Sequence, residues 1–314
     1  MIDRFNRRIE YVRVSLTDRC NLRCRYCMPE SGVTKLAHSE ILTYEEVLRV
    51  IRLLARLGIK KVRLTGGEPL IRMGIVDLIR SIKNLDGIER VVMTTNGVRL
   101  ASMAEQLIDA GLDGKIFKAI SRRDCFDRVL EGLNKILSLG MRDVKLNCVP
   151  LEEINDDVDD LIELIRDRDV KLRFIELMPI GLARDFKGLP LSTLRDRIEQ
   201  KFGRLMPIDS TEVQAGPAKY FRLSGFVGAI GFIDALEDKF CSTCNRVRLT
   251  AEGFLKLCLS APAGLDVKRL MRGGLDDEQL MLRLSSAIYN KPLEHAFDGA
   301  IELNDRRRMY QVGG

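Results

Sequence analysis

Short β-type runs alternate with longer helical patterns from residue 11 to about residue 180. In 43–58, apolar residues recur at helical spacing, Thr43 and Glu46 form a capping box, and Gly58 supplies a C-terminal stop. This alternation predicts an α/β fold built on a parallel sheet or barrel. The β-type runs lie at 11–17, 61–67, 90–96, 143–151 and 171–179.

Three of these runs carry a polar face, because residues two apart in a strand point to the same side. Parallel strands that helices cover normally read as continuous apolar runs. Repeated polar faces instead predict a lined, basic cavity inside an open barrel. The polar faces consist of Arg13, Ser15, Thr17, Arg63, Thr65, Lys145 and Asn147.

The alternation breaks once, after residue 113. Segments 101–114 and 115–140 both have a helical pattern, with no strand between them. We therefore expect an incomplete, open parallel TIM-type barrel that lacks one strand after residue 113. Such a loss would leave backbone groups of the neighbouring strands unpaired or force these strands together.

The pattern is less regular from about residue 182 onward. Segments 191–203 and 277–290 have a helical pattern, and 219–225 and 227–233 resemble strands. We predict two domains, a partial barrel over residues 1–181 and a smaller C-terminal region over residues 182–314.

Composition narrows the class of protein. The 314 residues are 46% hydrophobic, enough for a full-sized core, and no apolar run is long enough for a membrane span or a signal peptide. We therefore expect a soluble, cytoplasmic protein. A net charge of +6 suits an anionic ligand, but the absence of tryptophan argues against a nucleic-acid-binding module.

Three cysteines lie within eight positions, at Cys20, Cys24 and Cys27. In a reducing compartment they favour a metal centre over disulfides. A structural zinc site would need a fourth ligand, and neither His38 nor His295 stands at a suitable spacing. A 4Fe-4S cluster with three thiolates leaves its fourth iron open for a small molecule, which suits catalysis.

A second set of three cysteines is far away, at Cys241, Cys244 and Cys258. Alone it fits a fragment of a zinc ribbon as well as it fits a cluster, and the first set favours the cluster. Arg246 and Arg248 follow closely and suit a phosphate or a purine edge, although a solvated charged strand has the same pattern. We interpret Cys125 and Cys148 as structural residues, and both histidines as surface or satisfied structural residues.

Two glycine-containing turns follow predicted strands directly, at 64–70 and 94–97. Gly66 and Gly67 let backbone approach a neighbour or ligand closely. Polar turns at the carboxyl ends of strands are typical of the active sites of barrels.

Taken together, these residues resemble the radical S-adenosylmethionine superfamily, and more closely its GTP 3',8-cyclase family of molybdenum cofactor biosynthesis. The motifs are TDRCNLRCRYCMP, LTGGEPLIR, TTNG, RFIELMPIG, FCSTCNRVRLTAEGFLKLCL and the terminal GG. The resemblance covers nearly the whole chain.

The resemblance implies two 4Fe-4S clusters, one on each cysteine set, and S-adenosylmethionine as cofactor. It implies that Tyr26, Gly67 and Met178 contact S-adenosylmethionine, and it names no catalytic side chain. Gly313 and Gly314 would form a tail that reaches into the active site. The implied GTP-binding residues are Arg13, Arg63, Thr94, Lys145, Arg246 and Arg248.

The implied lyase reaction begins with reductive cleavage of S-adenosylmethionine to a 5'-deoxyadenosyl radical, which abstracts the 3' hydrogen of GTP. The product is (8S)-3',8-cyclo-7,8-dihydroguanosine 5'-triphosphate. The implied partners are an electron donor and a downstream cyclic pyranopterin monophosphate synthase, with no nucleic acid and no membrane. The oligomeric state stays open between a monomer and a homodimer. An alternative is another radical enzyme of this superfamily, with an auxiliary cluster and a different substrate.

One departure from the family lies at the break in the pattern. The family has a further strand there, followed by a Ser-Leu-Asp-Ser turn whose serine contacts S-adenosylmethionine. Here AGLDGKIFKAI continues without that turn. We therefore expect an enzyme impaired by the missing strand.

Overall fold

The strands of the protein form one continuous sheet. The computed structural model describes residues 1–34, 36–118, 125–209, 216–236, 239–295, 297 and 308–312. The strands are β1 (Tyr11–Ser15), β2 (Lys61–Thr65), β3 (Arg90–Thr95), β4 (Gly114–Lys118), β5 (Val144–Cys148), β6 (Val170–Ile175), β7 (Met206–Pro207), β8 (Lys219–Arg222), β9 (Ala229–Ile233), β10 (Arg246–Leu249), β11 (Phe254–Lys256) and β12 (Gly264–Asp266). Their order in the sheet is β12-β11-β10-β1-β2-β3-β4-β5-β6-β9-β8-β7.

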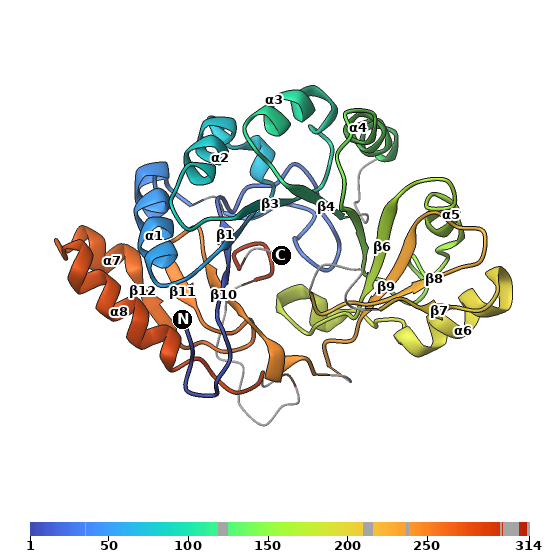
Figure 1. The fold of residues 1–314 in the computed structure, drawn as a ribbon. Coiled ribbons are helices and arrows are strands. Elements are labelled where there is room, and N and C mark those ends of the chain that lie inside the picture. The colour runs from blue at the N-terminus through green and yellow to red at the C-terminus, as the bar shows by residue number, and fades with distance from the viewer. Residues whose placement is uncertain are drawn as a thin grey trace.

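Helices surround the sheet. They are α1 (Tyr44–Arg56), α2 (Ile75–Lys83), α3 (Ala104–Asp109), α4 (Phe126–Ser138), α5 (Asp159–Glu163), α6 (Leu191–Phe202), α7 (Val267–Arg272) and α8 (Asp277–Tyr289). The sheet curves, and α1 to α4 lie on its convex side (Figure 1). The predicted α/β class is therefore confirmed.

Strands β1 to β6 run parallel, and the C-terminal region extends this sheet on both sides. β10 pairs in parallel with β1, and β9 pairs in parallel with β6. Antiparallel strands follow at each edge, β11 and β12 beyond β10, and β8 and β7 beyond β9. The two regions of the chain therefore share one sheet.

The strand predicted to be missing after residue 113 is present. Gly114–Lys118 forms β4, which pairs in parallel with β3 and with β5. The prediction was wrong because this short run was assigned to the helical pattern that follows it. The requirement for paired backbone between β3 and β5 outweighs that local pattern. The connection from β4 to α4 at 119–124 lies outside the described residues, so the expected loss of the serine turn stays a prediction.

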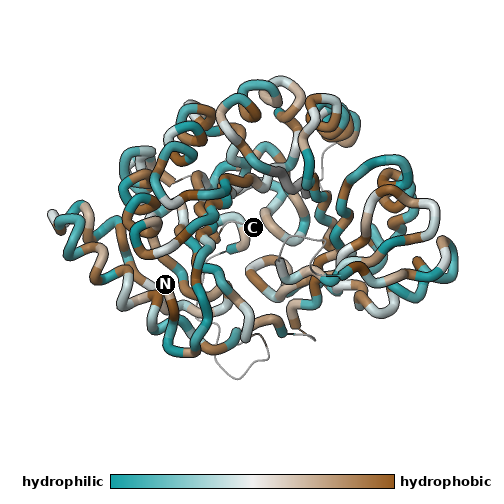
Figure 2. Tube along the Cα trace, in the orientation of Figure 1, coloured by the Kyte–Doolittle hydropathy of each residue, from teal (hydrophilic) through white to brown (hydrophobic). Residues whose placement is uncertain are grey.

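Apolar faces of strands and helices form the main core. On β1, Val12 and Val14 are fully buried between the sheet and the outer helices. Helix α1 begins with the predicted capping box, in which the Thr43 hydroxyl accepts from the Glu46 N–H and the Glu46 carboxylate accepts from the Thr43 N–H. Hydrophilic and hydrophobic positions alternate along the outer helices (Figure 2). Among the described residues, no helix is long and apolar enough to cross a membrane.

Candidate active site

A cavity of about 220 Å³ lies among the strands of the sheet and receives residues from both parts of the chain. All six residues expected to bind GTP line it, and so do the three cysteines of the second set. Tyr26 and Met178 line it as well, whereas Gly67 and the first cysteine set are not among the lining residues. The six are Arg13, Arg63, Thr94, Lys145, Arg246 and Arg248.

Strand register explains why the arginines meet. Arg13 on β1 lies directly opposite Arg63 on β2 and opposite Arg248 on β10. Removal from solvent and the nearby charge of Arg248 lower the pKa of Arg13 well below its usual value. Arg248 in turn has its pKa lowered to about 10, by burial and by Arg246. Cations that destabilise one another in this way favour an anionic ligand.

The sequence analysis missed several further lining residues, among them Tyr11, Lys61 and Arg173. Tyr11 and Lys61 lie two positions before Arg13 and Arg63, on the same strand faces. Arg173 lies opposite Asn147 in register and donates two hydrogen bonds to its Oδ1, at 2.9 and 2.7 Å. Extending the polar faces of the first two strands by one alternating position would have identified Tyr11 and Lys61.

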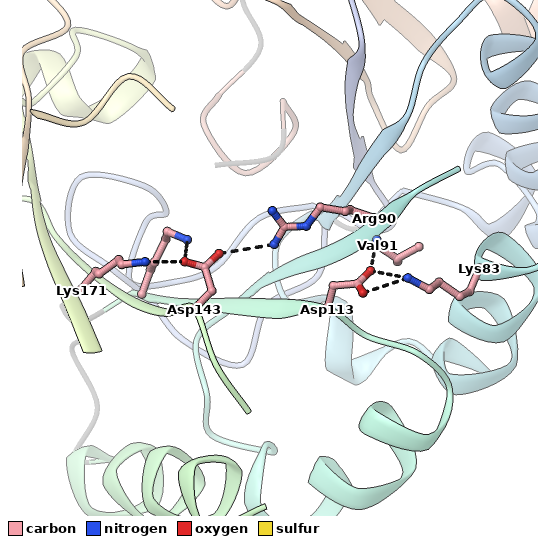
Figure 3. A network of polar contacts seen from close by, with 7 residues as sticks. Lys83, Arg90, Val91, Asp113, Asp143 and Lys171 are labelled. Carbon is pink, nitrogen blue, oxygen red and sulfur yellow. Dashed lines mark hydrogen bonds and ion pairs between the residues drawn. The ribbon is translucent and has the colours of Figure 1, made fainter. Parts of the chain in front are cut away.

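An ion network holds Lys145 at the edge of this cavity. Lys145 and Lys171 both donate to Asp143 Oδ1, the second at 2.9 Å, and Arg90 Nη2 lies 3.4 Å from Asp143 Oδ2. Figure 3 shows Asp143 between Lys171 and Arg90. Burial alone would raise the pKa of Asp143, but Lys145 and Lys171 outweigh it and hold the pKa well below its usual range. The network joins β5 and β6 to the start of β3.

A second ion pair, next to this network, joins helix α2 to the sheet. Asp113, just before β4, accepts from Lys83 Nζ at 2.8 Å and from the Val91 N–H at 2.6 Å (Figure 3). It ties helix α2 to β3 and to the start of β4. This pair has a structural role.

The first cysteine set lies on the loop that follows β1, and backbone hydrogen bonds within this loop shape it. The N–H groups of Cys27 and Met28 both donate to the Cys24 carbonyl at 3.0 Å. The Leu22 N–H donates to Cys20 Sγ at 3.4 Å, and Asn96 Nδ2 donates to it at 3.7 Å. Burial and the nearby Glu68 charge raise the pKa of the Cys20 thiol to about 11.

The glycine turn after β2 packs against the start of this loop. The Gly67 N–H donates to the Thr17 carbonyl at 2.7 Å, and a Cβ at Gly67 would lie 2.1 Å from the Arg19 carbonyl oxygen. Only glycine permits this approach. Glu68 then accepts from the Thr95 hydroxyl and the Asn96 N–H, at 2.6 and 2.7 Å. The turn therefore fixes the cysteine loop against the ends of β2 and β3.

Tyr26 and Met178 lie between the first cysteine set and the cavity. Tyr26 is 4% exposed, and Cys24 and Cys27 pack against the apolar cluster that contains it. Met178 packs on a second cluster, formed by Ile180, Met309 and Val312. Arg248 also donates to the Val312 carbonyl, at 3.4 Å. Residues 308–312 thus lie inside the curve of the sheet (Figure 1), and the following Gly313 and Gly314 are outside the described residues.

The second cysteine set comes from two segments. Cys241 lies in a short 3-10 helix (Cys241–Thr243), Cys244 lies two residues before β10, and the β10–β11 hairpin returns the chain to Cys258. Burial alone would raise the pKa of Cys244, but Arg246 and Lys291 outweigh it and lower the pKa to about 7. A thiolate is therefore favourable at this position.

Arg7 holds the loops that carry this second set. It pairs with Asp3 at 2.6 Å and donates to the Cys241 carbonyl at 3.0 Å. The same guanidinium donates to the carbonyls of Lys291, Pro292 and Leu293. Both segments that flank this end of the cavity are thereby fixed to the N-terminus.

The donor chemistry of both cysteine sets fits iron–sulfur clusters. None of these six cysteines is in a disulfide bond, and N–H donors reach Cys20 Sγ. In the described part of the chain, no group of three or more His, Cys, Asp or Glu side chains surrounds a position for a single metal ion. A 4Fe-4S cluster makes a different demand, because each thiolate binds its own iron.

The remaining cysteines and histidines have the environments that follow from their places in the fold. Cys148 is buried in the main core, as predicted, and Cys125 precedes α4. His38 is exposed. His295 is buried, donates from Nε2 to the Ala235 carbonyl at 2.7 Å and lines the cavity, but its Nδ1 is buried without a hydrogen-bond partner among the described residues. The expectation of a surface or fully satisfied histidine was therefore wrong for His295.

Comparison with known proteins agrees with this arrangement. Residues 14–165 match the radical SAM superfamily, and residues 170–297 match the family described as Molybdenum Cofactor Synthesis C. A GTP 3',8-cyclase of Clostridium perfringens (strain 13 / Type A) is 42% identical over 325 residues, covering 100% of both chains. The GTP 3',8-cyclase of Petrotoga mobilis is 41% identical over 334 residues, again covering 100% of each.

Solved structures support the fold. SuiB of Streptococcus suis, bound to its precursor peptide SuiA, aligns with a TM-score of 0.60 at 14% identity, over 93% of this chain and 66% of SuiB. A likeness at that identity concerns the fold alone. The full-length match to relatives at about 40% identity is the stronger finding: the chain belongs to the GTP 3',8-cyclase family of the radical S-adenosylmethionine superfamily.

Proposed function

We propose that this protein is a lyase that converts GTP to (8S)-3',8-cyclo-7,8-dihydroguanosine 5'-triphosphate in molybdenum cofactor biosynthesis. The observation that carries the proposal is one cavity lined by the six expected GTP-binding residues and by Cys241, Cys244 and Cys258. Full-length relatives with this activity in their names support it.

The first cysteine set would hold a 4Fe-4S cluster and S-adenosylmethionine, which when bound supply the radical that starts the reaction. Around it, Tyr26 and Met178 would pack on the cofactor between the cysteine loop and the cavity. Gly67 would act by holding the cysteine loop close to β2, because its backbone already contacts Thr17 and Arg19.

Cys241, Cys244 and Cys258 would hold another 4Fe-4S cluster, which would supply a binding site for the guanine of GTP. The cations on β1, β2, β5 and β10 would neutralise the triphosphate and orient the ribose. Thr94 supports this arrangement, because its Oγ1 accepts from Arg63 Nη1 at 3.3 Å. These residues bind and orient, and none is assigned a proton transfer.

We further propose that the sheet is an open, incomplete TIM-type barrel. The boundary between a radical domain (1–181) and a C-terminal auxiliary-cluster and GTP-binding region (182–314) would fall after β6. Figure 1 supports the first point, since β1 to β6 follow the curve with helices outside. Pairing of β9 with β6 and of β10 with β1 would make the two regions interdependent.

The partners of the reaction follow from its chemistry. An electron donor would reduce the first cluster, and a cyclic pyranopterin monophosphate synthase would take the product. Cysteines outside disulfide bonds suit a cytoplasmic location. Gly313 and Gly314 would continue the turn at 309–312 into the cavity.

Deuterium transfer tests this function. The reconstituted protein would be incubated without oxygen with S-adenosylmethionine, a reductant and GTP deuterated at C3'. We expect the deuterium to be found in 5'-deoxyadenosine. We also expect a cyclised nucleotide, formed in the same amount as 5'-deoxyadenosine. Deuterium-free 5'-deoxyadenosine together with unchanged GTP would indicate instead a radical enzyme with a different substrate.

A further inference from the structure

Tyr11 is the phenol that lies among the cations of the cavity. It is the first residue of β1 and lies opposite Lys61 on one side and Arg246 on the other. Its hydroxyl accepts a hydrogen bond from Arg63 Nε. Lys61 Nζ lies 5.3 Å from the centre of its ring, and the Arg63 guanidinium carbon lies 5.8 Å from it.

Charged groups surround this phenol from every strand packed against β1. Removal from solvent alone would raise its pKa, but Arg63, Arg13 and Lys61 outweigh that effect and lower the pKa to about 7. Its own charge acts on cations of two further strands. The charged or titratable groups that face it are Arg13, Lys61, Arg63, Arg173, Arg246 and Arg248.

We propose that Tyr11 is a positioning residue whose phenolate is the internal counter-ion of these cations, and that it takes up one proton from solvent when an anionic substrate binds. The O–H bond of the phenol forms with that proton, and no other bond changes. As a hydrogen-bond acceptor Tyr11 also orients Arg63, which Thr94 holds from the other side. The identity of the anion as GTP rests on the proposed function.

A second tyrosine of the same cavity behaves differently and serves as the control. Tyr220 lines the cavity and hydrogen-bonds Arg173, but burial raises its pKa. It therefore stays a neutral phenol below pH 9. The same substitution at the two positions separates the loss of a hydroxyl from the loss of a phenolate.

The test measures binding without turnover, by calorimetry on the cluster-containing protein without reductant and without oxygen. Wild type, Tyr11→Phe and Tyr220→Phe would be titrated with GTP and with inorganic tripolyphosphate at pH 7, 8 and 9. Above pH 7 the wild type must protonate Tyr11 to bind. We expect the ratio of the wild-type Kd to the Tyr11→Phe Kd to rise by about tenfold per pH unit.

Comparison of the variants cancels the proton uptake by other titrating groups. Burial lowers the pKa of Lys145 to about 7, so Lys145 also takes up a proton, but it does so in all three proteins. At pH 8, titration in two buffers of different ionisation enthalpy should show almost one more proton taken up by wild type than by Tyr11→Phe. The wild-type to Tyr220→Phe ratio should not change with pH.

A Kd ratio for Tyr11→Phe that stays constant from pH 7 to 9 would overturn the proposal. If that variant does not fold, tripolyphosphate added to the wild type at pH 8 should still remove tyrosinate absorbance, and an unchanged spectrum would contradict us. Proton uptake with tripolyphosphate but no binding of GTP would support the role of Tyr11 and sink the proposed function. Cyclisation of GTP together with equal proton uptake by wild type and Tyr11→Phe would support the proposed function and overturn the role of Tyr11.

Discussion

The two cysteine sets differ in their electrostatic surroundings at Cys20 and Cys244, although burial raises the pKa of Cys241 in the second set as well. Near Cys20, burial and the Glu68 carboxylate raise the pKa of the thiol to about 11. Near Cys244, Arg246 and Lys291 outweigh burial and bring the pKa of the thiol to about 7. The first set is part of one short loop beside an apolar cluster, whereas the second joins two segments at a cation-lined cavity.

This difference matches the ligands that the two sets are proposed to receive. S-adenosylmethionine carries a sulfonium cation, which an apolar and acidic surrounding tolerates. GTP carries a triphosphate, which needs the cations of the cavity. Each set provides three cysteine thiols, but the two sets would bind different ligands because the charges around them differ.

Loss of a single cysteine should separate the two tasks most strongly. Cys24→Ala should abolish 5'-deoxyadenosine formation and remove about four of about eight irons. Cys244→Ala should remove a similar number but keep some cleavage of S-adenosylmethionine, now independent of GTP. Iron analysis and quantification of 5'-deoxyadenosine would measure both.

Cys125→Ala is the matched control for these variants, because this cysteine belongs to neither set. It should keep the full iron content and GTP-dependent cleavage. GTP-dependent cleavage that survives in Cys244→Ala would contradict the division of tasks.

Loss of a cavity cation should affect only the GTP side. Arg248→Ala removes a guanidinium that lies opposite Arg13 on β1. Charge-assisted hydrogen bonds contribute about 1.5–3 kcal/mol each, so we expect kcat/KM for GTP to fall by roughly tenfold to a hundredfold. The concentration dependence on S-adenosylmethionine should stay as in wild type, and a parallel loss there would show that the two sides are not separate.

Loss of the acid that holds Lys145 should have a smaller effect. Asp143→Asn leaves Lys145, Lys171 and Arg90 without their shared carboxylate. We expect unfolding by urea to become easier by about 2 kcal/mol near neutral pH, and the KM for GTP to change while that for S-adenosylmethionine does not.

The pH dependence of this effect has a definite sign. Because the folded pKa of Asp143 is depressed, its stabilising contribution is present above the unfolded value near 4 and is lost as pH falls below it. Asp143 also holds up the pKa of Lys145, which is about 7, so the sign is tested below pH 5, where the difference between wild type and Asp143→Asn should shrink towards pH 3. A difference that grows between pH 5 and pH 3 would refute the ion network.

A change far from both sets provides the smallest effect. Thr43→Ala removes the hydroxyl that caps helix α1 and should cost about 1 kcal/mol of stability. Iron content and both substrate dependences should be those of wild type, as judged by the urea midpoint and the standard assay. A selective loss of one cluster would show that the outer helices discriminate between the two sets.

Local patterns predicted much of this molecule. Period-two alternation placed Arg13, Arg63 and Lys145 on cavity-facing strand sides, and the capping box placed the start of α1. The strand Gly114–Lys118 was missed because its existence depends on unpaired backbone in β3 and β5, which no local pattern reveals. Arg173 was missed although it shares a strand face with Lys171, opposite Leu172 and Phe174, and the register of β5 and β6 then sets it beside Asn147.

Electron paramagnetic resonance of two single-cluster proteins would test the central claim most directly. One would lack Cys241, Cys244 and Cys258, and the other would lack Cys20, Cys24 and Cys27. We predict that S-adenosylmethionine perturbs the reduced cluster only in the first protein and that GTP perturbs it only in the second. A perturbation by GTP in the first, or by S-adenosylmethionine in the second, would contradict the account.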